Sequence, residues 1–231
     1  MIKLRPSSER GHANHGWLES YHTFSFADYF DPQHVAYRTL RVINEDRVQG
    51  GKGFGTHPHH DYEIISYIVS GALKHEDSMG HAAVMRPGDM QRISSGTGIS
   101  HSEYNFSRSE PVHFLQIWLS PSHKGLPPGY AQKSFADAPT NDLKLACSAD
   151  GRNGSIVFNQ DADLYVGKLV AGGRVGHRLQ KQGHAWVQLI EGDLDLNGQK
   201  LAPGDGASVE EEMELHLTSK DGAHFLLFDL S

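Results

Sequence analysis

The sequence predicts an all-β protein made of two similar halves, and three observations support this prediction. Segments rich in β-branched and aromatic residues recur along the 231 residues, while long amphipathic helical patterns are missing. Glycine is abundant, at 25 residues, which suits a fold with many tight turns. The same turn signals also recur about half a chain apart. The clearest predicted strands are residues 37–43, 63–69, 112–119 and 185–190.

The repeat is an apolar strand followed by a glycine turn and later by a Pro-Gly-Asp turn. In the first half these turns contain Gly71 and residues 87–89, and in the second half they contain Gly192 and residues 203–205. In Pro-Gly-Asp, proline fixes φ, glycine adopts a positive φ and aspartate bonds the local backbone. Each turn alone is common, so the ordered pair in both halves is what indicates a duplicated β unit.

A proline-containing stretch separates the two halves. Residues 120–141 contain four prolines and several small residues, which is typical of a linker or a long excursion. We therefore expect an N-terminal domain at residues 1–120, a linker at 121–142 and a C-terminal domain at 143–231.

Charge and cysteine content narrow the function classes. The 28 acidic residues outnumber the 21 basic ones, and the net charge of −7 argues against direct nucleic-acid binding. The single cysteine, Cys147, cannot form an internal disulfide, so nothing indicates an oxidising compartment. Residues 1–20 lack the apolar stretch of a signal peptide, and no segment approaches the roughly 18 apolar residues of a membrane span. We expect a cytoplasmic protein that does not contact membranes.

Two pairs of candidate metal ligands stand out in the sequence, and they include three of its 16 histidines. His57 and His59 flank a proline, and His101 and Glu103 follow a glycine-rich turn. On a strand, residues i and i+2 share a face about 6.5–7 Å apart, so each pair can point at one ion. Three imidazoles and a carboxylate suit iron, nickel, copper, zinc or manganese.

In a histidine-rich chain, the two histidines of an isolated His-x-His more often lie at the surface by chance than bind a metal. The second pair, in His-x-Glu, makes the metal interpretation the better one. His60 has the wrong parity for the same face. We expect the remaining histidines of interest to lie at the surface or in ordinary hydrogen bonds: His12, His15, His22, His34, His75, His81, His113 and His123.

These residues resemble the two motifs of the cupin superfamily. The first motif, G-x5-H-x-H-x3,4-E-x6-G, is matched with one extra residue before the last glycine by Gly51, His57, His59, Glu63 and Gly71. The second motif ends in G-x2-H-x3-N and is matched by Gly98, His101 and Asn105. The resemblance implies a bicupin, in which two jelly-roll β-barrels pack together.

Within that superfamily the chain resembles the pirin family and its bacterial quercetin dioxygenases. The resemblance covers nearly the whole chain and is carried by residues 16–18, 23–26, 57–59, 76–80 and 96–103. Many cupins use the first-motif glutamate, Glu63, as the fourth ligand, whereas pirins use the carboxylate two residues after the third histidine. The resemblance thus implies one divalent metal held by His57, His59, His101 and Glu103, with Glu63 nearby.

The second half departs from the motif. It offers His177-Arg-Leu179 where His-x-His would fall, and His216 lies in a plain alternating strand. We therefore expect the C-terminal barrel to bind no metal, which the resemblance also implies.

The resemblance implies a metal-dependent dioxygenase that cleaves flavonols such as quercetin with O2 to a depside and carbon monoxide. Iron is the first expectation for the metal, with nickel, copper, cobalt, manganese and zinc as alternatives. Glu103 is the first candidate for the catalytic proton acceptor and Glu63 the second. The aromatic substrate would need an apolar pocket, for which the candidates are Phe24, Phe26, Phe54, Met85 and Trp118.

Two other functions stay open at this point. Some pirins are regulators in which the iron redox state tunes a protein–protein contact, and a chain of that kind would not need to be an enzyme. A third alternative is a cupin isomerase or hydrolase that uses the metal as a Lewis acid. We expect a monomer, for which a protein partner is possible.

Overall fold

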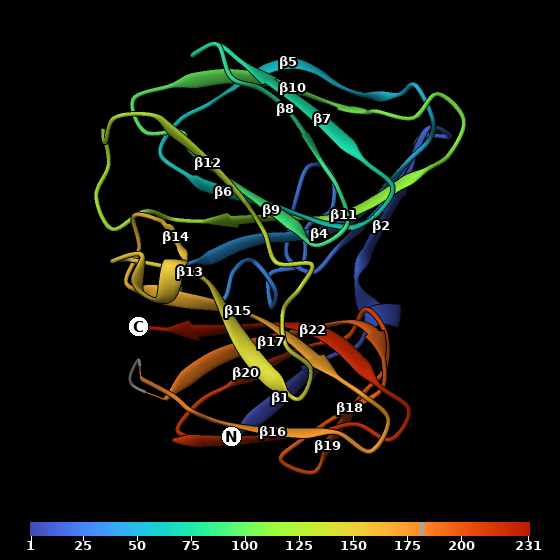
Figure 1. Cartoon of the computed structure of the whole chain (residues 1–231), viewed down its shortest axis with the longest axis vertical. Coiled ribbons are helices and arrows are strands. Elements are labelled where there is room, and N and C mark those ends of the chain that lie inside the picture. The colour runs from blue at the N-terminus through green and yellow to red at the C-terminus, as the bar shows by residue number, and fades with distance from the viewer. Residues whose placement is uncertain (181–182) are drawn as a thin grey trace. The chain divides into compact units, whose positions relative to one another are not determined.

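The computed structural model describes residues 1–180 and 183–231, and its regular structure is almost entirely β-strand (Figure 1). The chain forms two compact units. We call them the N-terminal barrel, residues 11–136 and 158–160, and the C-terminal barrel, residues 1–10, 137–157 and 161–231.

The N-terminal barrel consists of a seven-stranded and a four-stranded sheet. The larger sheet has the order β12-β9-β6-β11-β4-β3-β2 and the smaller one β5-β10-β7-β8. The strands of the larger sheet are β2 (Gly11–Asn14), β3 (Leu18–His22), β4 (Leu40–Val48), β6 (Glu63–Ser70), β9 (Asp89–Ser94), β11 (Val112–Leu119) and β12 (Gly129–Ser134). Those of the smaller sheet are β5 (Gly53–His59), β7 (Leu73–Asp77), β8 (Ala82–Met85) and β10 (Ile99–Asn105).

The C-terminal barrel has the same two-sheet plan. Its larger sheet has the order β1-β20-β17-β22-β15-β13-β14, and its smaller sheet β16-β21-β18-β19. The larger sheet contains β1 (Ile2–Arg5), β13 (Asp142–Ser148), β14 (Ile156–Val157), β15 (Ala162–Leu169), β17 (His184–Gly192), β20 (Gly206–Val209) and β22 (Ala223–Leu230). The smaller sheet contains β16 (Arg174–Arg178), β18 (Leu194–Leu196), β19 (Gln199–Leu201) and β21 (Glu214–Thr218). Two short 3₁₀ turns complete the unit, η1 (Ser7–Glu9) and η2 (Arg152–Gly154).

The strand orders of the two barrels correspond one to one. The run β9-β6-β11-β4 has its counterpart in β20-β17-β22-β15, and β5-β10-β7-β8 in β16-β21-β18-β19. The prediction of an all-β chain with a duplicated unit is therefore confirmed.

The four predicted strands all form, and one of them differs in extent. Three of them correspond closely to β6, β11 and β17. The strand predicted at residues 37–43 instead begins at Leu40 and continues to Val48. Its second half contains the polar residues Asn44, Glu45 and Asp46, all of them buried. Because they are polar, the sequence pattern there does not predict a strand.

Edge strands do not follow the predicted linear division of the chain. Within the stretch predicted as a linker, Gly129–Ser134 forms β12 and pairs with β9. At the start of the chain, Ile2–Arg5 forms β1 and pairs with β20 of the C-terminal barrel. Such pairings join segments far apart in sequence, so local patterns do not reveal them. The division into residues 1–120, 121–142 and 143–231 stays a prediction about which segments fold independently.

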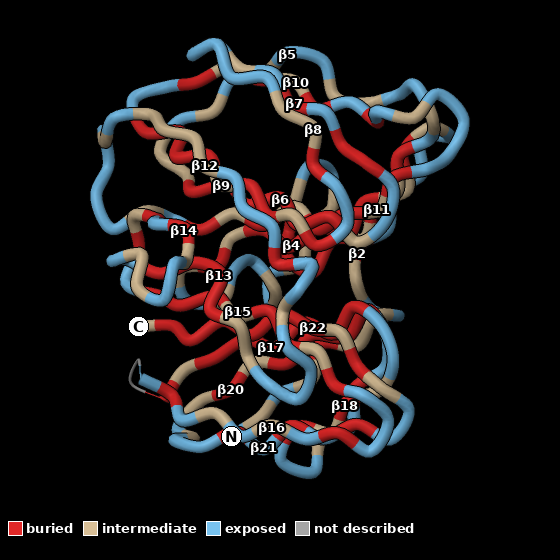
Figure 2. Tube along the Cα trace, in the orientation of Figure 1, coloured by how far each residue is buried: buried red, intermediate tan, exposed pale blue. Residues whose placement is uncertain are grey.

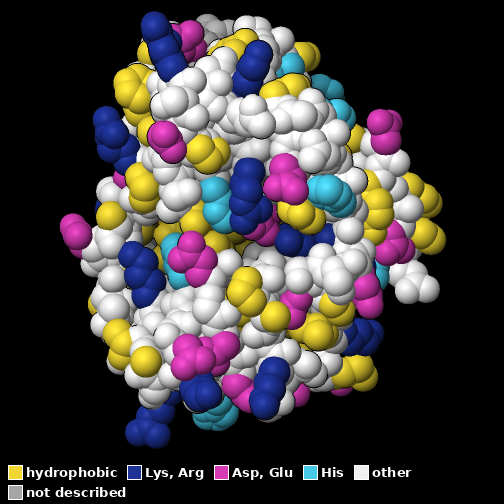
Figure 3. Space-filling model, turned by 90° about the vertical axis from the view of Figure 1, so that its right-hand side faces the viewer, with side chains coloured by type: hydrophobic (Ala, Val, Ile, Leu, Met, Phe, Trp, Pro, Cys, Tyr) yellow, Lys and Arg dark blue, Asp and Glu magenta, His cyan; other side chains and the backbone are white. Residues whose placement is uncertain are grey.

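Buried residues, red in Figure 2, lie along the strands of both barrels, and most of them are apolar. In the N-terminal barrel one core cluster includes Leu18, Val48, Ile68, Leu73, Met85, Val112 and Phe114. No helix in residues 1–180 and 183–231 has the length and apolar character needed to cross a membrane. On the face drawn in Figure 3, acidic and basic side chains are interspersed among the described residues.

Candidate metal centre

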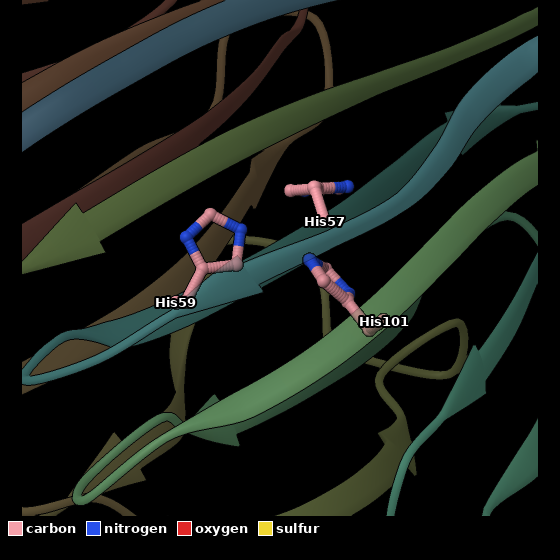
Figure 4. Close-up of side chains that lie close together, drawn as sticks. All are labelled: His57, His59 and His101. Carbon is pink, nitrogen blue, oxygen red and sulfur yellow. The ribbon is translucent and has the colours of Figure 1, made fainter.

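The three predicted histidine ligands come from two neighbouring strands of the smaller sheet. His57 and His59 lie two residues apart on β5, and His101 lies on β10, where it pairs with His57. Figure 4 shows the three imidazoles grouped beside these strands. The register between the two strands shifts between His101 and Glu103, which marks a β-bulge. Bulges are frequent next to functional sites because they re-aim side chains.

The three rings face a common centre. Their centroids lie 4.7 Å apart for His57 and His59, 4.5 Å for His57 and His101, and 4.9 Å for His59 and His101. Each residue offers a ring nitrogen, and these nitrogens all lie within 4.8 Å of one another. Nitrogens bonded to one metal at about 2.0–2.1 Å lie at most about 4.2 Å apart, so small side-chain shifts would bring these three onto a single ion.

His101 shows that the donor set fits a metal ion. Its side chain is 1 % exposed, and neither ring nitrogen has a hydrogen-bond partner in the described part of the chain. Leaving a buried polar group unsatisfied costs about 1–3 kcal/mol. A metal ion bound to one of these nitrogens would relieve that cost, so the residues present suit a bound cation.

Local backbone features orient His57 and β5. The His57 Nδ1 lies 2.7 Å from the carbonyl oxygen of Gly55, a contact in which Nδ1–H donates and Nε2 keeps its lone pair for a metal. A Cβ on Gly53 would lie 2.3 Å from the carbonyl oxygen of Glu103. The glycine-rich approach to the motif therefore lets β5 pack closely against β10.

Glu103 points into the barrel and is held by three donors. Ser66 Oγ donates to Oε1 at 3.0 Å, Gln91 Nε2 donates to Oε1 at 3.2 Å, and Gln116 Nε2 donates to Oε2 at 2.8 Å. The side chain is 1 % exposed. Its carboxylate oxygens are not within 4.8 Å of all three histidine nitrogens, so the structure groups the histidines more tightly with one another than with Glu103.

The donors to Glu103 belong to a polar ladder on the inner face of the larger sheet. We define the polar ladder by five residues at paired positions across β3, β4, β11, β6 and β9, namely His22, Asn44, Gln116, Ser66 and Gln91. Four of these side chains are buried and Gln116 is partly buried, and such a row is costly unless its members are hydrogen-bonded. The Glu103 carboxylate satisfies one end of the ladder.

His75 is a residue whose place the sequence prediction missed. It was expected at the surface or in an ordinary hydrogen bond; it does form a hydrogen bond, but the prediction did not place its side chain where it lies, fully buried on β7 opposite Glu103. Its Nε2 lies 3.1 Å from Asp77 Oδ2, and one of its nitrogens lies within 4.8 Å of ligand atoms of His101 and Glu103. Leu73, His75 and Asp77 alternate along a strand and therefore share one face, and this pattern could have predicted that His75 points inward with Leu73.

Glu63 does not share the site. On β6 it alternates with Ile64, so it faces the opposite side of the sheet from the inward-facing Ile64 and Ser66. Its carboxylate accepts hydrogen bonds from Ser94 Oγ at 2.9 Å and from Asn159 Nδ2 at 3.0 Å. This geometry does not support Glu63 as a second proton acceptor.

A cavity of about 400 Å³ opens beside the histidines. Of the predicted apolar pocket residues, Phe26, Phe54 and Trp118 line it, whereas Phe24 and Met85 are buried elsewhere in the barrel. The Trp118 indole also packs edge-on against His59, with centroids 4.9 Å apart. The remaining lining residues are His12, Ala13, His15, Leu18, Ser20, His22, Ala27, Asp28, Tyr29, Asn44, Asp46, His57, His59, Glu103 and Gln116.

Two of the imidazoles are held neutral at pH 7. Burial, followed by the neighbouring histidines, lowers the pKa of His59 to about 4 and that of His101 to about 3. Only a neutral imidazole binds a metal, and its ordinary pKa is about 6.5. These two ligands therefore need not lose a proton when a metal binds at pH 7.

We expect metal occupancy to hold as pH falls through about 6.5 and to be lost at lower pH, as the histidines protonate. Dialysis against buffers of decreasing pH, followed by elemental analysis, measures this. Half-loss at or above pH 6.5 would contradict the lowered pKa values, and full occupancy at about pH 3 would contradict histidine ligation.

The C-terminal barrel has leucines on the strand that corresponds to β10. Leu215 and Leu217 of β21 are fully buried in its apolar core, while His216 between them is exposed. Within residues 1–180 and 183–231, the clusters close enough to hold a metal lie in the N-terminal barrel. The metal-free second barrel stays a prediction.

We expect one equivalent of tightly bound metal per chain, because the ligand sets found among the described residues lie in the N-terminal barrel and share His101. Elemental analysis of well-washed protein, purified without a metal-binding tag, measures the ratio. Two tightly bound equivalents would contradict the prediction.

Comparisons with known proteins match both barrels of this chain. Residues 3–119 match the family model described as Pirin, and residues 145–230 match the one described as Quercetinase C-terminal cupin domain. The quercetin 2,3-dioxygenase of Escherichia coli K12 is 44 % identical over 230 residues, covering 100 % of this chain and 99 % of the relative. A pirin-like protein of Caulobacter vibrioides is 34 % identical over 231 residues, covering 99 % of each.

A solved structure of a metal complex is also similar to this chain. The crystal structure of the bacterial pirin YhhW from Escherichia coli in complex with nickel(II) has a TM-score of 0.95 and 42 % identity, covering 100 % of this chain and 99 % of that one. The family matches and the identities extend over both barrels, as does the structural likeness. This chain, with its histidine cluster and its two cupin barrels, belongs to the pirin family.

Proposed function

We propose that the chain is a flavonol dioxygenase whose N-terminal barrel holds one divalent metal through His57, His59, His101 and Glu103. The observation that carries the proposal is the cluster of three histidine nitrogens within 4.8 Å of one another, beside a cavity of about 400 Å³. The 44 % identity to a quercetin 2,3-dioxygenase supports the same reaction class.

The residues around the cavity suit a planar, hydroxylated aromatic substrate. Phe26, Phe54 and Trp118 supply apolar and aromatic walls, and a cavity of this size falls in the range typical of small-molecule sites. When bound, a divalent metal lowers the pKa of a hydroxyl group that binds to it, so a flavonol loses its 3-hydroxyl proton near neutral pH.

Glu103 is the residue that takes this proton in the proposal. Its carboxylate lines the cavity, and the donors Ser66, Gln91 and Gln116 fix the positions of its two oxygens. A positioned base of this kind contributes about 10²–10⁴-fold to a reaction rate. In the overall reaction, one dioxygen is consumed for each flavonol cleaved, and one carbon leaves as carbon monoxide.

Oxygen consumption with quercetin tests the proposal. Protein loaded in turn with iron, nickel, copper, cobalt or manganese should consume oxygen and release an equal amount of carbon monoxide with at least one metal. Absence of turnover with every metal would overturn the proposal. The non-enzymatic regulator, in which the metal acts as a sensor, would then be the better account of the same site.

A further inference from the structure

Asp46 is a buried carboxylate that the metal site does not use. It lies on β4, is 4 % exposed and lines the cavity together with Asn44, its neighbour on the same face of the strand. The metal ligands His57 and His59 line the same cavity from the smaller sheet. The cavity therefore extends from the histidine cluster to Asp46.

One oxygen of Asp46 is left for a ligand. Ser20 Oγ, directly across from it on β3, donates to Oδ1. The other oxygen, Oδ2, has no hydrogen-bond partner within the described part of the chain. It is not fully sealed, so solvent can reach it. An ionised carboxylate accepts up to about four hydrogen bonds, so a single donor leaves Asp46 undersatisfied.

In the surroundings of Asp46, a carboxylate with too few hydrogen bonds has an unfavourable free energy. Burial raises the pKa of Asp46 to about 7, and the nearby Glu103 and Glu45 raise it further, against the hydrogen bond from Ser20. A buried acceptor of this kind is stabilised by any donor that enters the cavity. Phe54, which shares the cavity, carries no donor, and the Trp118 Nε1–H has no hydrogen-bond partner among the described residues, so neither compensates Asp46.

The neighbouring polar side chains of the ladder form hydrogen bonds with one another and with Glu103, and these bonds do not involve Asp46. In the polar ladder, His22 Nδ1 lies 2.9 Å from Asn44 Oδ1, and Gln116 Nε2 donates to Glu103. The ladder thus binds Glu103 at one end, and at its other end it borders the cavity beside Asp46.

We propose that Asp46 determines specificity by accepting a hydrogen bond from a ring hydroxyl of the aromatic substrate, remote from the hydroxyl that lies at the histidine cluster. This inference rests on the proposed function and deepens it. The substrate class it names is a polyhydroxylated flavonol, one with hydroxyl groups besides the 3-hydroxyl. A substrate bearing the 3-hydroxyl alone would leave Asp46 without its donor.

The test compares the binding of two flavonols to metal-loaded protein under argon, where turnover does not occur. Quercetin carries several ring hydroxyls, and 3-hydroxyflavone carries only one. Quenching of tryptophan fluorescence reports binding, since Trp118 lines the cavity. The readout is the ratio of the two dissociation constants in wild type, in Asp46→Asn and in Asp46→Ala.

At a pH above about 7, where Asp46 is ionised, we expect wild type to prefer quercetin, and the preference to fall about tenfold to a hundredfold in Asp46→Ala, because a hydrogen bond to a charged group is lost. Asp46→Asn should show a smaller fall in the same direction. A purely structural role would weaken both ligands equally and leave the ratio unchanged. Glu45→Gln is the matched control, because Glu45 faces the other side of β4, contacts His113 and Arg47, and does not line the cavity.

The outcomes separate this inference from the proposed function. If the wild type binds both flavonols and turns over quercetin in air, but both Asp46 variants keep the wild-type ratio, only the role of Asp46 is overturned. If the wild type binds neither flavonol, the proposed function fails and the role of Asp46 fails with it. A lowered ratio in both Asp46 variants with an unchanged ratio in Glu45→Gln supports the inference.

Discussion

Replacing His101 with alanine is expected to remove most of the bound metal while both barrels remain folded. His101 is the most deeply buried of the three clustered histidines, and its nitrogens have no hydrogen-bond partner among the described residues. Loss of an outer-shell partner typically costs about 10–100-fold in metal affinity, so loss of a direct ligand should exceed that range. Elemental analysis and a competition titration with a chelator measure the affinity.

His60→Ala is the matched control for this substitution. His60 adjoins His59 in sequence, but its side chain is 81 % exposed and it lies outside the histidine cluster. Circular dichroism and thermal unfolding of both variants show whether the fold is retained. A His101→Ala protein that keeps wild-type metal affinity would show that the cluster does not hold the metal.

Replacing Glu103 with glutamine is expected to retain some metal but to lose most turnover. The amide cannot accept the substrate proton, and loss of a general base costs about 10²–10⁴-fold in rate. The substitution also places an N–H₂ group near the donors Gln91 and Gln116, so we expect the free energy of unfolding to fall by about 1–3 kcal/mol. Steady-state oxygen consumption and chemical denaturation measure the two effects.

Glu63→Gln provides the comparison. Glu63 is as buried as Glu103, and its carboxylate also accepts several hydrogen bonds, but from Ser94 and Asn159 and away from the cavity. It should lose stability by a similar amount and keep its turnover. Equal loss of turnover in both variants would mean that Glu103 acts only through stability.

Local patterns predicted the residues whose positions follow strand parity. His57 and His59 lie two apart on β5, and His101 follows a turn that local glycines specify, so the cluster could be located from spacing alone. The duplicated fold was predictable for the same reason, because its turns recur in order in both halves. The expectation that Glu103 rather than Glu63 is the fourth ligand came from the family resemblance, since spacing alone allowed either, and it stays a prediction.

The residues that the sequence did not reveal depend on pairing between distant strands. Asn44 and Asp46 face the barrel interior because β4 pairs with β3 and β11. Their polar side chains, taken with their sequence neighbours alone, predict a loop instead of a strand. His75 enters the site through the pairing of β7 with β10. β1 and β12 form edge strands by pairing with strands far away in the sequence, and a short segment of sequence does not predict such pairing.

Anomalous diffraction from crystals of metal-loaded protein tests the central claim most directly. With data collected at the absorption edge of the loaded metal, we expect one strong peak per chain, about 2.0–2.2 Å from a nitrogen of each of His57, His59 and His101 and from an oxygen of Glu103. For Glu103 this means a shift relative to the present structure, in which it lies closer to His75 and His101 than to the full histidine cluster. A peak bonded to His75, His101 and Glu103 but not to His57 and His59, or a second peak in the C-terminal barrel, would contradict the assignment.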